Sequence, residues 1–242
     1  MDIVTVQPHP ALKKYIDFYY LIKNDSSSFS SVHYSFPHTA NVVSIYKQAK
    51  FSGALGETKL SHDPTNNFVT IIQAKCQLPL KVSLLGPTDR ISIWFNPFGI
   101  NQFIKQPLSE LMSEVSCHFS AWDSDPEYHK TLKQCFSTQS GDEKIALLEA
   151  FLLNKLCLVD TTKMQQVTDR LLDFQQNHNI ETIAEELNLS VRTLNRHFKQ
   201  MLGVSLIEYR NIARFRHSLT NKLFNDHFNR LTEVAYQSNF YD

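Results

Sequence analysis

Four polar side chains repeat at helical spacing in the stretch from Val191 to Met201. They are Arg192, Asn195, Arg196 and Lys199. Residues three or four apart share one face of a helix, so these side chains would project together. Arginine and asparagine donate the paired hydrogen bonds that distinguish guanine and adenine in a major groove, and lysine suits phosphate. The pattern favours contact with double-stranded DNA over the simpler alternative, a solvated basic face on an ordinary helical domain.

The element that carries these side chains is predicted to be the second helix of a helix-turn-helix. The first helix is marked by an apolar stripe at Ile180, Ile183, Ala184 and Leu187. Asn188 and Leu189 interrupt the stripe, and the Ser190 hydroxyl can cap a helix that begins at Val191. The face of this second helix that we expect to pack carries Val191, Leu194, Phe198 and Met201.

The net charge of the whole chain is balanced, but its distribution is not. Lys and Arg number 24, as do Asp and Glu, and hydrophobic residues make up 42% of the 242 residues. This composition is that of an ordinary globular protein with room for two modest domains. From Ser190 to Lys222, by contrast, seven Lys and Arg residues occur with a single acidic residue, Glu208. Such a concentration of positive charge is typical of a phosphate-binding surface.

The cysteines and the start of the chain bear on the class of protein. Cys76, Cys117, Cys135 and Cys157 are widely spaced and form no CxxC pair, so neither a zinc site nor a disulfide framework is indicated. The first residues lack the basic and apolar segments of a signal peptide, and no apolar stretch approaches the ~20 residues that span a membrane. We therefore expect a cytoplasmic protein with reduced thiols and no membrane partner.

The front half is predicted to be rich in β-structure. Residues 11–22 suit either a helix or a strand. Between Ser31 and Phe95, short β-rich runs alternate with turn-forming clusters. The runs are 42–46, 68–73, 82–85 and 91–95. Short strands with polar turns indicate a small antiparallel sandwich or barrel.

Helices are expected after Pro97 and Gly99. A helix or turn is expected at 107–115, and helices at 125–136 and 142–158, with Pro126 at a favoured first-turn position. The third helix carries a wide apolar face, which we expect to pack on its own sheet, and the alternative is a dimer interface. The polar segment 159–163 then marks the boundary between a domain at 1–160 and a second domain at 164–242.

The second domain is predicted to be helical and to contain an internal repeat. Helices are expected at 164–178 and at 206–223, with Gly203 ending the basic helix and Ser205 capping the next one. Leu231 to Ala235 repeats the pattern of Ile180 to Ala184, with equivalent alanines 51 positions apart. A second helix and turn therefore recur after one intervening helix, as in duplicated units.

The residues of this tail resemble the DNA-binding domain of the AraC/XylS-type transcriptional regulators. The similar positions are Ala184, Leu189, Ser190, Leu194, Arg196, Phe198, Lys199, Gly203, Ser205, Tyr209 and Arg214, within a similarity that extends from Gln165 to Asp242. In that family a long helix joins two helix-turn-helix units, each of which places a recognition helix in a major groove. The front part is more weakly similar to a domain that precedes this module in many such regulators. The resemblance implies an α+β protein, with an N-terminal cupin-like antiparallel β-barrel or sandwich with helices, used for sensing or dimerisation, followed by an all-α helix-turn-helix domain.

The resemblance also implies roles for individual residues. Base reading falls to Arg192, Asn195 and Arg196, and phosphate contacts fall to Ser190, Thr193 and Lys199. The implied partners are double-stranded DNA, a small-molecule effector and a second copy of the chain. In two departures from the family, Asn239 stands in place of a glycine, and the sequence ends at Asp242, where the second recognition helix would begin. We therefore expect a second unit without its reading helix, either because it is truncated or because the protein works with one reader per chain. Its last residues are expected to be poorly held or to pack on another surface.

Other functions receive little support from the sequence. His33, His38 and His62 are the best candidates for a metal site, but four residues separate the first two, where the cupin pattern has one. No glycine-rich phosphate loop, GxSxG elbow or HExxH motif occurs, and Asp123 and Asp125 flank a helix start, where capping is the common role. We expect no enzyme activity, cofactor or metal. The remaining alternative is a small-molecule-binding protein whose truncated DNA-binding domain no longer binds DNA well.

Overall fold

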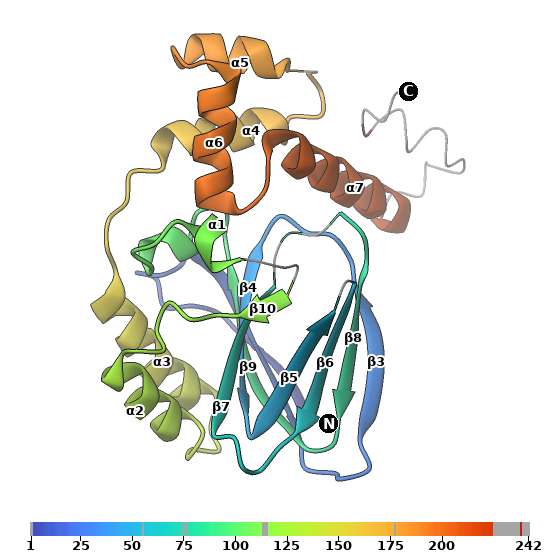
Figure 1. The fold of residues 1–242 in the computed structure, drawn as a ribbon, viewed down its shortest axis with the longest axis vertical. Helices are drawn as coiled ribbons and strands as arrows, with labels where there is room; N and C mark the ends of the chain where they lie inside the picture. Colours follow the sequence, from blue (N-terminus) through green and yellow to red (C-terminus); the bar gives the residue numbers. More distant parts are fainter. Residues whose placement is uncertain are drawn as a thin grey trace.

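Strands occupy most of the first half of the chain and helices most of the second (Figure 1). The computed structural model describes residues 2–54, 56–73, 75, 77–112, 116–176, 178–224 and 238. The strands are β1 (Asp2–Val6), β2 (Ile16–Asn24), β3 (Ser30–Ser35), β4 (Asn41–Lys47), β5 (Ala49–Ala54), β6 (Glu57–His62), β7 (Phe68–Gln73), β8 (Leu80–Leu85), β9 (Thr88–Phe95) and β10 (Ser116–His118). The helices are a 3₁₀ turn η1 (Ile100–Gln102), α1 (Leu108–Leu111), α2 (Pro126–Cys135), α3 (Gly141–Lys155), α4 (Thr162–Leu171), α5 (Ile180–Glu186), α6 (Val191–Leu202) and α7 (Leu206–Phe224).

The strands form two sheets that pack against each other. The larger sheet has the order β1-β2-β9-β4-β7-β10, and neighbouring strands in it are antiparallel. The smaller has the order β3-β8-β6-β5, and its β6 and β8 are parallel, because the chain passes through β7 of the other sheet between them. The β-rich front half is confirmed. Of the two expected alternatives, the described strands form the sandwich and not a closed barrel, and the expectation of purely antiparallel strands is wrong because β6 and β8 are parallel.

Side chains alternate along the central strands and thereby separate two interiors. On β9, Ile91, Ile93 and Phe95 belong to the core beneath the helices. Arg90 and Trp94 on the same strand line the space between the two sheets. The larger sheet therefore has an apolar face toward the helices and a mixed face toward the smaller sheet.

Helices α2 and α3 cover the outer face of the larger sheet (Figure 1). Asp125 and Ser140 cap their first turns by accepting hydrogen bonds from backbone N–H groups at 3.0 and 3.3 Å. The apolar stripe of α3 is buried, with Ile145 and Leu148 at most 2% exposed. The expected capping role of Asp125 and the packing of this helix on its own sheet are confirmed.

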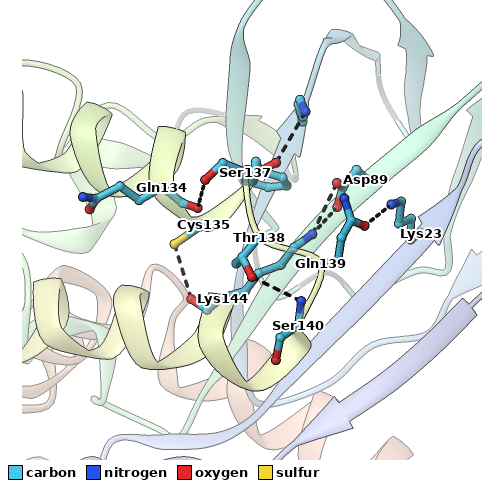
Figure 2. A network of polar contacts seen from close by, with 11 residues as sticks. Lys23, Asp89, Gln134, Cys135, Ser137, Thr138, Gln139, Ser140 and Lys144 are labelled. Carbon is cyan, nitrogen blue, oxygen red and sulfur yellow. Dashed lines mark hydrogen bonds and ion pairs between the residues drawn. The ribbon is translucent and has the colours of Figure 1, made fainter.

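A buried ion pair fastens α3 to β9 (Figure 2). Lys144 Nζ lies 3.1 Å from Asp89 Oδ1, and the two side chains are 7% and 19% exposed. The Cys135 thiol donates to the Lys144 carbonyl oxygen at 3.3 Å, and burial raises the pKa of this thiol to about 11. It therefore stays protonated at neutral pH and acts as a small, nearly apolar group. Cys117, Cys135 and Cys157, the cysteines within the described residues, are free thiols.

Several expectations change in the structure or lie outside it. The ambiguous stretch 11–22 ends in β2, a strand. Within 107–112, the described part of the segment expected to be a helix or turn, the chain forms the short helix α1. The helix expected at 164–178 ends at Leu171, after which Asp173 accepts from the Gln175 N–H at 3.0 Å and favours a turn. The repeat at 231–235, the Asn239 departure and the expected loose end fall outside the described residues. No helix in the described ranges is long and apolar enough to cross a membrane.

Helices α4 to α7 pack around a second core. Its buried members include Val167, Ile183, Leu194, Phe198 and Tyr209. Phe98, from the loop after β9, also lies in this core, with its ring edge-on to that of Phe198 at a centroid distance of 6.3 Å. Phe98 has φ 64°, a conformation that a bulky residue rarely adopts. The division into domains at 1–160 and 164–242 stays a prediction, and Phe98 is a contact across it.

The long helix α7 begins with a reciprocal cap. The Glu208 N–H donates to Ser205 Oγ at 3.2 Å, and the Ser205 N–H donates to Glu208 Oε2 at 2.7 Å. The expected capping role of Ser205 is confirmed. This cap fixes the first turn of α7.

The segment between α3 and α4 is held by the side chain of Gln102. Its Nε2–H donates to the Val159 carbonyl oxygen at 3.1 Å, and its Oε1 accepts from the Val159 N–H at 2.9 Å. Gln102 is 3% exposed, so this pair of bonds is shielded from water. The polar segment that we predicted as a linker is therefore tied to the β-rich part of the chain at Val159.

Candidate nucleic-acid interface and ligand cavity

The turn between α5 and α6 follows from its sequence. Asn188 adopts a left-handed conformation with φ 55°, which asparagine tolerates better than most residues. Ser190 caps α6 by accepting from the Thr193 N–H at 3.2 Å. At the other end of α6, Gly203 has φ 77°, the left-handed geometry that commonly ends a helix. The predicted roles of Ser190 and Gly203 in bounding this helix are confirmed.

Three cationic side chains form an exposed face on α6. Arg192, Arg196 and Lys199 are exposed, whereas Leu194 and Phe198 on the packed face are fully buried. No salt bridge among the described residues engages these three cations. The C-terminal end of α6 lies beside α1, and its N-terminal end points away from the sheets (Figure 1). The structure thus leaves this cationic face open to a partner.

The other predicted contact residues already have partners inside the fold. Asn195 Oδ1 accepts from the Leu206 N–H at 3.0 Å and so satisfies a free donor at the start of α7. The Ser190 hydroxyl donates to Thr193 Oγ1 at 3.0 Å. Asn195 and Thr193 are half-buried, whereas Ser190 is exposed. Their roles as DNA ligands stay predictions, and each residue also has a structural role.

The positive charge counted from Ser190 to Lys222 does not lie on one face. Arg210 and Arg214 of α7 are half-buried and line a narrow cleft together with Arg170 and Asp173. Arg170 also forms an ion pair with Glu186 of α5. The cations available on the exposed face of α6 are therefore fewer than the sequence count suggested.

A cavity of about 390 Å³ lies between the two sheets. Larger-sheet strands β2, β4, β7 and β9 line one side, and β3, β6 and β8 line the other. Its polar lining includes Ser31, His33, Ser35, Ser44, Tyr46, Thr58, Gln73, Arg90, Ser92 and Ser116, and its apolar lining includes Val42, Ile71, Val82, Leu84 and Trp94. Ile3 also lines the cavity and is 47% exposed, so the cavity reaches the surface beside β1.

Arg90 supplies the positive charge of this cavity. Its Nη1 donates to Tyr46 Oη at 3.2 Å, and its guanidinium carbon lies 5.4 and 5.7 Å from the ring centroids of Tyr20 and Tyr46. Its Nε is buried without a hydrogen-bond partner among the described residues. Burial, and then the charge of Arg90, lower the pKa of His33 below its usual value, so this histidine is neutral at pH 7. No Asp or Glu of the described chain lines the cavity.

The histidines considered as metal ligands do not come together. His33 lines the cavity, His38 lies beside Trp94 with ring centroids 5.0 Å apart, and His62 is exposed at the end of β6. Burial, and then the charge of Lys75, lower the pKa of His38 to about 4. Within the part of the chain that the structure describes, no group of three or more His, Cys, Asp and Glu residues could hold a metal ion.

Two residues of this region were not identified from the sequence. Arg90 precedes the strand residues Ile91 to Phe95, and extending their alternation by one position would have placed it on the inward face. Lys75 is 4% exposed and donates from Nζ to the Leu202 carbonyl oxygen at 3.2 Å. That bond joins positions 127 residues apart, so no local pattern could have indicated it.

Comparisons with known proteins add one family match and weak structural similarities. Residues 4–116, somewhat under half of the chain, match the model of a domain of unknown function, DUF6597. No curated protein matches the chain. A 1.65 Å structure of ToxT from Vibrio cholerae is 12% identical over 93% of this chain and 89% of that chain, with a TM-score of 0.43, and ToxT bound to an unsaturated fatty acid is 15% identical over 93% and 87%, with a TM-score of 0.41. Values this low do not establish a shared fold or function.

Proposed function

We propose that this chain is a sequence-specific DNA-binding transcriptional regulator of the AraC/XylS type rather than an enzyme. Residues 164–242 are its DNA-binding domain, and residues 1–160 form its sensing or dimerisation domain. Helices α5 and α6 act as a helix-turn-helix, with α6 in the major groove of double-stranded DNA. The choice of family rests on the sequence resemblance between Gln165 and Asp242.

The exposed cationic face of α6 is the observation that carries this proposal. Arg192, Arg196 and Lys199 point outward, while Leu194 and Phe198 anchor the opposite face in the second core. A reading helix needs a fixed position and free donors for bases and phosphates. The packed face of α6 supplies the first requirement, and its exposed face supplies the second.

Individual roles follow from the position of each side chain. We assign base reading to Arg192, Asn195 and Arg196 and phosphate contacts to Ser190, Thr193 and Lys199. The two guanidinium groups support this assignment best, because they are exposed and can form paired bonds to guanine. Asn195 can still offer its amide N–H₂ to a base while its Oδ1 accepts from Leu206, which limits it to fewer contacts.

Selection of binding sites from random duplexes by the full chain tests the proposal. We expect an enriched motif, and for Arg196→Ala a loss of about 1–3 kcal/mol confined to particular base positions. Arg196→Lys keeps the charge but loses the paired bond, so it should relax the same positions with less effect on non-specific affinity. An unchanged base preference in both variants would contradict the role of Arg196.

Lys199 can be tested separately, because a phosphate contact has a different signature. Lys199→Ala should weaken binding to all duplexes alike and reduce the slope of log affinity against log salt by about one. Lys59→Ala is the matched control, since this exposed lysine of β6 carries the same charge far along the chain from α6. A base-specific effect of Lys199→Ala would overturn its assignment to phosphate.

The proposed regulator acts as a homodimer, because single helix-turn-helix units generally rely on two-fold symmetry for sufficient affinity. Sedimentation equilibrium of the full chain, alone and with the selected duplex, measures this directly. A chain that binds its selected sites tightly as a strict monomer would contradict the dimer.

The second candidate function is a small-molecule-binding protein that does not bind DNA well. The observation that favours it is the cavity of about 390 Å³ between the sheets. Gel shifts over a salt series discriminate the two functions, because true duplex binding weakens steeply with salt. Absence of salt-dependent duplex binding by a folded chain that still binds a small molecule would favour this alternative.

A further inference from the structure

We propose that the cavity between the two sheets binds a small organic acid, whose carboxylate meets Arg90 and whose apolar body lies along Trp94, Ile71 and Val82. This inference deepens the proposed sensing role by naming the chemical class of the effector. It rests on the proposed function only in that binding of the acid is expected to regulate the protein, since binding itself involves no contact with DNA.

The charge balance of the cavity is the first argument. Arg90 is always protonated at neutral pH, and no Asp or Glu of the described chain lines the cavity with it. The neighbouring carboxylate, Asp89, cannot compensate, because it is paired with Lys144 on the helix-covered face of the sheet. Arg90 is half-buried, and a partly desolvated cation without a counter-charge gains from a partner that supplies one. An anionic ligand would complete this pair.

The geometry of Arg90 is the second argument. Tyr46 accepts one of its five N–H donors at 3.2 Å, and the rings of Tyr20 and Tyr46 hold the guanidinium in place. The buried Nε has no hydrogen-bond partner among the described residues. A guanidinium that is fixed by two rings and keeps unused donors is suited to the paired hydrogen bonds of a carboxylate.

The remaining walls set the size and polarity of the ligand. Val42, Ile71, Val82, Leu84 and Trp94 offer apolar contact in the same cavity as Arg90. The volume of about 390 Å³ lies near the lower end of the roughly 300–1,000 Å³ of small-molecule sites. Thr58 Oγ1 and Ser116 Oγ are buried without partners in the described structure and could serve one further polar group. These features fit a monoacid with a compact apolar body better than a nucleotide or a sugar.

Calorimetric titration of the full chain at pH 7 with 3-phenylpropionate and with 3-phenylpropionamide tests the proposal. The two probes share one skeleton and differ in charge, so their difference isolates the carboxylate. We expect the acid to bind about tenfold or more tightly than the amide, as a charge-assisted bond implies. Binding should also change the fluorescence of Trp94, which lines the cavity, and this places the probe.

Variants at Arg90 test whether this residue causes the preference for the acid. Arg90→Gln should abolish the preference for the acid, and Arg90→Lys should keep part of it, because lysine retains the charge without the paired donors. Lys59→Gln removes a positive charge from an exposed position of β6 and should leave the preference intact. If Arg90→Gln fails to fold by circular dichroism, Arg90→Lys still reports the loss of paired bonding.

The proposal is overturned by equal affinity for acid and amide in the natural chain, or by a preference that survives in Arg90→Gln. Straight-chain carboxylates and their amides extend the test to ligands with other apolar groups. If the chain prefers the acid neither in these pairs nor in the phenylpropionate pair, the proposal is also overturned. Because DNA is absent, this failure is distinct from failure of the regulator proposal. A chain that binds duplex DNA but no organic acid would contradict the proposed class of effector and leave the regulator proposal standing.

Discussion

The ammonium group of Lys75 donates a hydrogen bond to the carbonyl oxygen of Leu202 at 3.2 Å, at the last turn of α6. The same group donates to Asn41 Oδ1 at 2.5 Å, at the start of β4. Lys75 is 4% exposed, so both hydrogen bonds are shielded from water. The carboxyl end of α6 is thereby tied to the strands that also line the cavity.

Removing this lysine should loosen α6 from the β-rich part of the chain. In Lys75→Met the Leu202 carbonyl and the Asn41 amide lose their shared donor, and we expect a loss of about 1–3 kcal/mol of stability at pH 10.5, the upper end of the range over which this lysine titrates. Hydrogen exchange should become faster at the backbone amides of the last turn of α6, and Lys59→Met on exposed β6 serves as the control. Equal protection in both variants would show that the contact does not hold the helix.

The same lysine should make stability depend on pH. Burial lowers the pKa of Lys75 from 10.5 to about 7, so between these values the unfolded chain binds more protons than the folded one. Stability therefore rises with pH through this window, by up to about 1.4 kcal/mol per unit, and the full cost of the buried charge is present below pH 7. His38, whose pKa is lowered to about 4, stays neutral throughout.

Chemical denaturation of the natural chain and of Lys75→Met at several pH values between 7 and 10.5 measures this slope. The difference in unfolding free energy between the two proteins should move in favour of the natural chain as pH rises. A constant difference across the window would mean that Lys75 is not titrating there.

The bounds of α6 could be predicted from the sequence because they depend on local chemistry. Ser190 Oγ accepts from the Thr193 N–H within the first turn, and Gly203 adopts its left-handed geometry directly after the helix that it ends. The short β-rich runs at 42–46 and 91–95, set between turn-forming clusters, likewise indicated the strands β4 and β9, since both signals are local.

The cavity and the contacts between the two halves could not be predicted, because they depend on pairing over long distances. Nothing near Glu57 indicates that β6 lies parallel to β8, and the sandwich interior depends on that pairing. Phe98 lies between Pro97 and Gly99, which marked only the end of the sheet in the sequence, yet it enters the core of the helices. Asn195 was assigned to DNA from its helix face alone, whereas the start of α7, eleven residues later, engages its side chain.

Asn195 should therefore affect stability and DNA reading in separable ways. Asn195→Ala leaves the Leu206 N–H without its acceptor, and we expect a loss of about 0.5–2 kcal/mol in unfolding free energy. Asn195→Asp keeps an acceptor near the positive end of α7 and should retain most of the stability. It cannot donate to a base, however, so the base preference should change in both variants.

Thermal unfolding and binding-site selection on the two variants check this separation. If Asn195→Asp is as unstable as Asn195→Ala, the bond to Leu206 does not contribute as the distance suggests. If Asn195→Asp is stable and reads the same bases as the natural chain, Asn195 has a structural role alone.

We expect the ion pair between Lys144 and Asp89 to contribute strongly to the stability of the β-rich part (Figure 2). Lys144→Met leaves the mostly buried Asp89 without its partner, so we expect the free energy of unfolding to fall by roughly 3 kcal/mol. This is the low end of the range for buried ion pairs, because Asp89 keeps some exposure to solvent. Replacing both residues, as in Lys144→Met with Asp89→Leu, should recover a large part of this loss. Denaturant unfolding of the single and double variants measures the coupling, and additive losses would contradict it.

Gly203 should resist substitution for two reasons that can be told apart. Its φ of 77° strains any residue with a Cβ by about 1–2 kcal/mol, and a Cβ would lie 2.8 Å from Met112 Cε. Gly56 has φ 76° with nothing within 4 Å of such a Cβ, so Gly56→Ala measures the backbone strain alone. We expect Gly203→Ala to lower the unfolding free energy by more than Gly56→Ala, and the excess to disappear when Met112→Ala is added. If Gly203→Ala shows no excess, the flexible end of Met112 moves aside without cost.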